Sequence, residues 1–167
     1  MQNLKHTPEQ RKVTCVYGRK RKTWCGPYAV AVVTGLQYED TYKALKKIRG
    51  KRSTAGVTMK NMMTACSKFG VKTERTKLEK RKKLNNFLKD NLAPNKVYIV
   101  EITRHVIVVD TRDCQTIDNQ SLIWEDMYST KHKNKLVRSF VEIKNPKFDP
   151  MHNNMDFRFT EQLAAQS

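Results

Sequence analysis

A cysteine stands where the sequence predicts the start of a buried helix. Cys25 follows Trp24, precedes Gly26 and Pro27, and leads into a small apolar run at 29–33. Proline suits a first helical turn. A helix N-terminus offers unpaired N–H groups and the positive end of the helix dipole, and both favour a thiolate. Gly26 would leave room for a substrate beside the sulfur. The pattern predicts a cysteine nucleophile, with a buried structural cysteine as the alternative.

A histidine opens the most apolar predicted strand. His105 comes directly before the run at 106–109 and after the polar pair Thr103-Arg104. A histidine at the mouth of a strand is well placed to act as a general base. The other three histidines (His6, His132 and His152) fall in an arm, a loop and a tail, with no apolar element to hold them. We therefore expect His105 to be the base.

A third residue should orient the imidazole of His105. If residues 105–110 and 114–119 form a hairpin, the residue paired with His105 is 118 or 119, depending on turn length. These positions are Asp118 and Asn119, and either side chain can accept a hydrogen bond from the ring. Both stay open, with Asp118 favoured because a carboxylate stabilises an imidazolium better than an amide does. The order of a Cys-His-Asp/Asn triad is then complete.

The elements that must position these residues follow from hydrophobic spacing. Helical spacing predicts helices over about 25–34, 38–49, 59–69 and 84–88, and β-rich runs predict strands at 12–17, 97–102, 105–109, 115–117 and 136–143. Helices followed by an antiparallel sheet predict an α+β domain. We expect one domain over 1–144 with a loose arm at 1–11, and a polar tail at 145–167 that is either disordered or docked. Cys66 lies in a methionine-rich helical stripe, which predicts a packed core thiol.

Basic charge is concentrated in the first part of the chain. The whole sequence has 33 basic and 16 acidic residues, a net charge of +17. Residues 1–100 hold 24 basic and 6 acidic residues (24 − 6 = +18), and residues 101–167 hold 9 and 10 (9 − 10 = −1). Such a field attracts polyanions: nucleic acid, an anionic membrane or an acidic protein. A solvated basic surface with no dedicated partner is the alternative.

Several classes of protein are excluded by composition. No run approaches the roughly 18 apolar residues of a membrane span, so we expect no membrane partner. The polar start of the chain predicts no secretory signal, and hence a cytoplasmic location. The cysteines at 15, 25, 66 and 114 form no CxxC pair, which argues against a zinc ribbon or a disulfide framework. We expect no metal and no cofactor.

Three segments together resemble the papain-like cysteine peptidase superfamily. They are Thr23-Trp24-Cys25-Gly26-Pro27-Tyr28-Ala29, the stretch 105–110, and Ile117-Asp118-Asn119. The pattern is most similar to double-glycine-leader peptidases and small phage-encoded relatives, and it covers roughly residues 17–120. The resemblance implies a helical lobe carrying Cys25, packed on a small antiparallel sheet carrying His105. It also implies thiolate attack on the carbonyl of a protein or peptide, followed by hydrolysis of the thioester. A phage-encoded protein would act in the host cytoplasm or with the virion.

The sequence departs from this family at one position. The family usually has a glutamine about six residues before the nucleophile, which donates to the oxyanion; here the residue is Arg19. We expect Arg19 and the N–H of Cys25 to be the oxyanion donors. Lys20, Arg21 and Lys22, with Trp24 and Gly26, are expected to bind the substrate or a polyanion.

The missing glutamine keeps other functions open. Loss of one oxyanion donor typically costs about 10²–10³ in rate. A catalytically reduced papain-like fold could therefore bind nucleic acid, or assemble with a virion or ribonucleoprotein, through its basic half. Acyl transfer to an amine is a further alternative, because transglutaminase-like domains share the Cys, His, Asp order.

Overall fold

The computed structural model describes residues 24–50, 54, 56–121 and 124–147. The arm at 1–11, the strand expected at 12–17 and most of the polar tail lie outside these residues.

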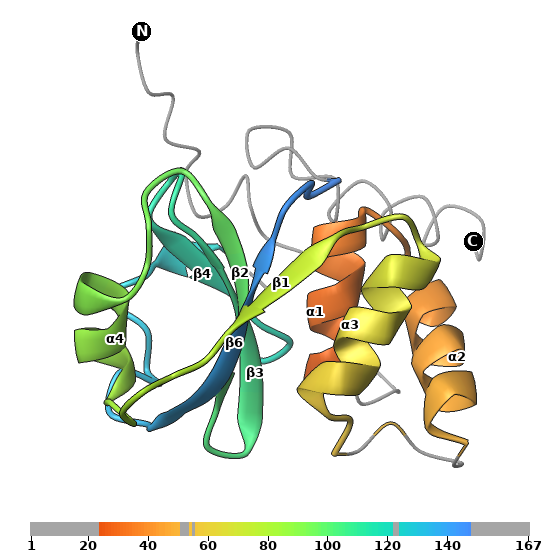
Figure 1. The fold of residues 1–167 in the computed structure, drawn as a ribbon, viewed down its shortest axis with the longest axis horizontal. Helices are drawn as coiled ribbons and strands as arrows, with labels where there is room; N and C mark the ends of the chain where they lie inside the picture. The colour runs from red at the N-terminus through yellow and green to blue at the C-terminus, as the bar shows by residue number, and fades with distance from the viewer. Residues whose placement is uncertain (1–23, 51–53, 55, 122–123, 148–167) are drawn as a thin grey trace, which may run out of the picture.

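The described chain is an α+β fold with its helices concentrated at the N-terminal end (Figure 1). The element order is α1 (Cys25–Thr34), α2 (Tyr38–Arg49), α3 (Met59–Lys68), β1 (Thr73–Thr76), α4 (Leu84–Asp90), β2 (Val97–Ile102), β3 (His105–Asp110), β4 (Gln115–Ile117), β5 (Glu125–Asp126) and β6 (Val137–Ile143). The six strands form one sheet in the order β1-β6-β2-β3-β4-β5, and all neighbours are antiparallel. The α+β prediction and the four helices are confirmed; the short strands β1 and β5 were not predicted.

The central strands are apolar on both sides because each face of the sheet is covered. On one face, Ile99 of β2 and Val108 of β3 pack with α1, α2 and α3. On the other face, Val100 and Ile107 pack with Phe87 of α4. Figure 1 shows α1, α2 and α3 on one side of the sheet and α4 on the other. A strand that is buried on both faces is expected to be a nearly continuous apolar run, and β2 and β3 have this composition.

Two hydrogen bonds from α2 hold the N-terminal end of α1. The Thr41 hydroxyl donates to the Pro27 carbonyl over 2.9 Å, and both groups are buried. The Trp24 backbone N–H donates to the Tyr38 hydroxyl over 2.9 Å. Cys25, the first residue of α1, is therefore flanked on both sides by residues that α2 fixes.

The C-terminal end of the described chain packs against the helices. The Lys72 backbone N–H donates to Asn145 Oδ1 over 2.7 Å, and the Lys147 N–H donates to the Val33 carbonyl over 3.0 Å. Ordered packing therefore continues past residue 144. Within the described residues, no helix combines the length and apolar character needed to cross a membrane.

Gly26 lets α1 approach the turn before α3. It is buried in the first turn of α1, and a Cβ built there would collide with Val57 Cγ2. The branched side chain of Val57 has little rotamer freedom with which to move aside. The glycine is thus required by packing beside the candidate nucleophile.

This packing yields a testable prediction. Gly26→Ala should lower the free energy of unfolding by about 1–3 kcal/mol, even though alanine has the better helix propensity, because the added methyl overpacks the contact. In a Val57→Ala background the same change should be nearly neutral. Denaturant unfolding of the two single variants and the double variant measures the coupling. Equal effects in both backgrounds would contradict the packing account.

Candidate active site

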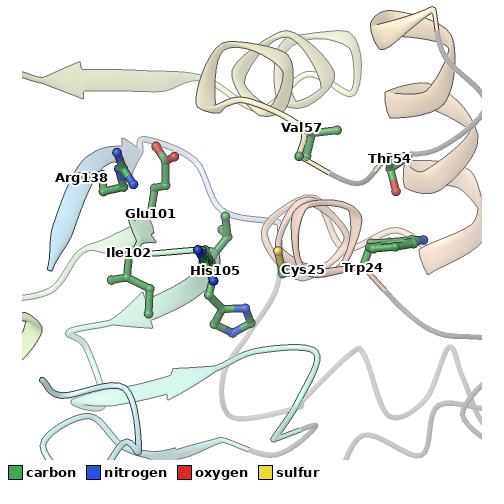
Figure 2. Close-up of a pocket in the computed structure, with 11 residues that line it drawn as sticks. Trp24, Cys25, Thr54, Val57, Glu101, Ile102, His105 and Arg138 are labelled. Atoms are coloured by element: carbon green, nitrogen blue, oxygen red, sulfur yellow. The ribbon is translucent and has the colours of Figure 1, made fainter. Parts of the chain in front are cut away.

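Cys25 and His105 line one pocket between the helices and the sheet (Figure 2). The pocket has a volume of about 410 Å³. Its walls include Trp24 and Val57 on the helical side and Arg104 and Arg138 on the strand side. Cys25 is half-buried. The predicted nucleophile and base are therefore brought together from positions 80 residues apart (105 − 25 = 80).

His105 is the first residue of β3, and one of its ring nitrogens has a hydrogen-bond partner. Its Nε2 lies 2.8 Å from Asp118 Oδ2. Cys25 lines the same pocket, near enough to help raise the pKa of His105. Because Nε2 is occupied by Asp118, Nδ1 is the nitrogen left to face the sulfur. The resulting order is thiol, imidazole, carboxylate.

The carboxylate of Asp118 accepts four hydrogen bonds. The backbone N–H groups of Gln120 and Ser121 donate to Oδ1 over 2.9 and 2.7 Å. The Nε2 atoms of His105 and His132 both lie 2.8 Å from Oδ2. The residue is only 3% exposed, so these bonds replace its hydration almost completely.

The hydrogen bonds of Asp118 determine which side chains of the site are charged. Burial alone would raise the pKa of Asp118, but the hydrogen bonds from His105 and from the N–H of Ser121 hold that pKa well below its usual range. Asp118 is thus ionised and can only accept, so Nε2 of each imidazole must carry the donated proton. Burial would lower the pKa of His105, but the hydrogen bond to Asp118 and the proximity of Cys25 outweigh it and the pKa is raised. Both shifts favour a charged imidazolium beside the sulfur.

Asp118 reaches His105 by a route that differs from the predicted strand pairing. Val108 pairs with Ile117, and β4 ends there, so neither residue 118 nor 119 lies opposite His105. The prediction was wrong because the turn between Asp110 and Gln115 is longer than assumed. The chain instead folds into a tight turn after β4, in which the side chain of Asp118 caps two backbone N–H groups. Of the two candidates, Asp118 is the one that bonds the imidazole, and Asn119 follows it in the turn.

His132 was missed from the sequence. We expected it in a loop with no apolar element to hold it, but it is only 2% exposed and bonded to Asp118. Its ring centroid lies 4.6 Å from that of His105. The polar surroundings of His132, Thr130-Lys131-His132-Lys133-Asn134-Lys135, give no hydrophobic period that could have signalled burial. Only the tertiary contact reveals it.

The remaining predicted site residues have different outcomes. Trp24 lines the pocket, and its binding of a substrate stays a prediction. Gly26 is buried against Val57, so its missing side chain makes room for a protein contact. Arg19 and the neighbouring Lys20, Arg21 and Lys22 lie outside the described residues. Cys66 is fully buried in the core, and burial raises its thiol pKa to about 12, as the prediction of an inert thiol requires.

Within the described residues, one group has the composition of a metal site. Donor atoms of His105, Asp118 and His132 lie within 4.8 Å of one another. A cation bound through the Nε2 atoms would have to displace their protons, since each contact with Asp118 is a hydrogen bond of 2.8 Å. The observed geometry is that of two donors on an anion.

Comparison with known proteins adds no relative to this picture. No family model matches the chain, and no curated protein matches it. The residues of the site and their geometry are therefore the basis for the function proposed for this protein.

The buried carboxylate makes stability depend on pH. Asp118→Asn should lower the free energy of unfolding by about 2–3 kcal/mol at pH 7, because the amide nitrogen must face N–H donors that now meet an anion. A depressed folded-state pKa stabilises the protein above the unfolded value of about 4 and loses that effect as pH falls below it. The gap between wild type and variant should therefore shrink on going from pH 7 to pH 3, measured by denaturant unfolding. A gap that is the same at both pH values would contradict this account.

Proposed function

We propose that the protein is a cysteine peptidase or related amide hydrolase of papain-like type. Cys25 is the nucleophile, His105 the base and Asp118 the orienting residue. The observation that carries the proposal is that Cys25 and His105 line one pocket, and that the imidazole of His105 is hydrogen-bonded to the buried carboxylate of Asp118. A structural cysteine needs neither an imidazole partner nor a pocket.

The chemistry follows from the atoms. The Cys25 thiolate attacks the carbonyl carbon, the C–S bond forms, and the carbonyl oxygen becomes an oxyanion. The N–H of Cys25 is left free of intrahelical bonds at the start of α1 and can donate to that oxygen. The His105 imidazolium gives its Nδ1 proton to the leaving amine, which breaks the C–N bond. His105 then takes a proton from water, which attacks the thioester and releases the acid and the thiol.

The charge of the pocket supports an acidic substrate segment. Arg104 and Arg138 line it, and among the described residues neither makes an ion pair. Arg104 has a φ of 57° in the tight turn between β2 and β3, a conformation that costs energy for a residue with a side chain. Among the described residues that line the pocket, the acidic side chain is that of Glu101, which accepts a hydrogen bond from Ser139. The basic run at 19–22 has the same sign of charge, and Arg19 stays a proposed oxyanion donor.

Binding of nucleic acid or a virion assembly remains the second function proposed, because residues 1–100 carry +18 (24 − 6). The two functions differ in what they require of Cys25. An enzyme needs a reactive thiol coupled to His105, whereas polyanion binding needs only charge and falls steeply with salt.

Selective labelling tests the enzymatic proposal. At pH 6 an electrophilic thiol probe should modify Cys25 at least 10-fold faster than Cys114, which is exposed and has no imidazole partner within the described part of the chain. His105→Gln should remove the advantage, because it removes the imidazolium. Peptide mapping by mass spectrometry gives the rate at each cysteine, and the Cys114→Ala variant is the matched control. Equal rates at the two thiols would reject the enzyme and leave salt-dependent binding as the function to test.

The arginines predict charge selectivity. Replacing Arg104 and Arg138 together with Gln should raise KM for an acidic peptide about 10-fold or more, while KM for its neutral amide analogue changes little. Arg112, whose guanidinium is already paired with Asp110, supplies the control variant Arg112→Gln. Steady-state kinetics at two salt concentrations measure the effect. An unchanged preference for the acidic peptide would show that these arginines do not recognise the charge of the substrate.

A further inference from the structure

Two imidazoles share one oxygen of one buried carboxylate. His105 and His132 each place Nε2 at 2.8 Å from Asp118 Oδ2, although β3 and the loop before β6 are 27 residues apart (132 − 105 = 27). Their rings lie tilted, with centroids 4.6 Å apart. The catalytic step proposed above uses His105 alone, so His132 has no assigned role.

The backbone around His132 holds its ring in place. The His132 N–H donates to the Thr130 hydroxyl, and the Lys135 N–H donates back to the His132 carbonyl over 2.9 Å. The Leu84 N–H, at the start of α4, donates to the Lys135 carbonyl over 2.8 Å, which ties this loop to the buried first residue of that helix. The direction from which His132 approaches Asp118 is therefore fixed by the fold.

The buried position of the His132 ring is energetically unfavourable for one of its nitrogens. His132 Nδ1 is buried and has no hydrogen-bond partner among the described residues. Because Nε2 donates to an ionised carboxylate, Nδ1 of the neutral ring carries a lone pair that nothing satisfies. An apolar side chain would fill the same space without that penalty, so packing alone does not account for a histidine here.

We propose that His132 is a positioning residue for the candidate active site: by donating to Asp118 Oδ2, it sets the direction and limits the strength of the hydrogen bond between Asp118 and His105. This proposal rests on the proposed function. An oxygen shared by two donors offers less negative charge to each than an oxygen with one donor. His105 consequently keeps its proton less tightly than it would beside an unshared carboxylate, and can release it to a leaving group.

The surrounding charges are consistent with this division of roles. Burial, and the positive charge that His105 can carry, both lower the pKa of His132, so that ring stays neutral while His105 is charged. Lys135 acts on His132 in the same direction. Cys25 faces His105 from α1, and Glu125 of β5, with Lys131 near it, faces Asp118.

The wild-type protein provides the first test. Nitrogen NMR of ¹⁵N-labelled histidine should show His132 as the neutral Nε2–H tautomer across the pH range in which His105 titrates. A His132 ring protonated at Nδ1 alone, or one that gains its proton together with His105, would overturn the proposal. This measurement needs no variant and no substrate.

Two variants test the shared oxygen. His132→Leu removes the donor, and His132→Gln keeps an N–H at about the same reach. In the leucine variant His105 should hold its proton to a pH higher by about half a unit to one unit, the scale of the net free energy of one ordinary hydrogen bond. The fast labelling of Cys25 should then persist to correspondingly higher pH, while the glutamine variant follows wild type.

Failure of this proposal and failure of the proposed function are distinguishable. If wild-type Cys25 shows no labelling advantage that depends on His105, the enzymatic function fails. If that advantage exists but the leucine variant leaves its pH profile unchanged, or the glutamine variant shifts as far as leucine, His132 does not act through the shared oxygen. Thermal unfolding of both variants identifies one that has not folded, and the tautomer of wild-type His132 then decides.

Discussion

The buried carboxylate of Asp118 is the constraint that links the candidate site to the fold. An ionised carboxylate removed from water is strongly unfavourable unless each of its oxygens is hydrogen-bonded. Its donors come from the turn after β4, from the start of β3 and from the loop before β6. All three segments must be in place together, so the sheet, the loops around it and the charge of the site form as one unit.

The nucleophile is positioned by a separate set of contacts on the helical side. Gly26 allows close packing against Val57. Hydrogen bonds with the side chains of Thr41 and Tyr38 fix the residues around Cys25. The sheet fixes the imidazole independently. The pocket therefore lies where two layers meet, and small adjustments between the layers change the distance between sulfur and ring. Sites that depend on such geometry lose rate when a supporting contact shifts by about an ångström.

The fold was predictable where local signals were strong. Gly35, Gly50 and Gly70 all take positive φ at or just after helix ends, and Thr58 caps α3 with Asn61 as its partner. The apolar runs of β2, β3 and β6 are buried as their composition indicates. The two strands that were not predicted lack such an apolar run: β1 is mostly exposed, and β5 has only two residues. Their existence depends on pairing with neighbours, which no local pattern encodes.

The sequence by itself determined the four helices and the order of the longer apolar strands, the helix start that carries Cys25, the strand that opens with His105 and the inert character of Cys66. These properties reside in spacing, capping and hydrophobicity, which act over a few residues. Only the tertiary structure decided between Asp118, which the sequence already favoured, and Asn119, showed that Asp118 bonds His105 from a turn and not from a paired strand, and revealed His132 as a second partner. These outcomes depend on turn geometry and on a contact between polar segments that are distant in the sequence. Such a hydrogen bond produces no periodic pattern in the sequence, because the packing of the intervening elements determines which polar groups meet.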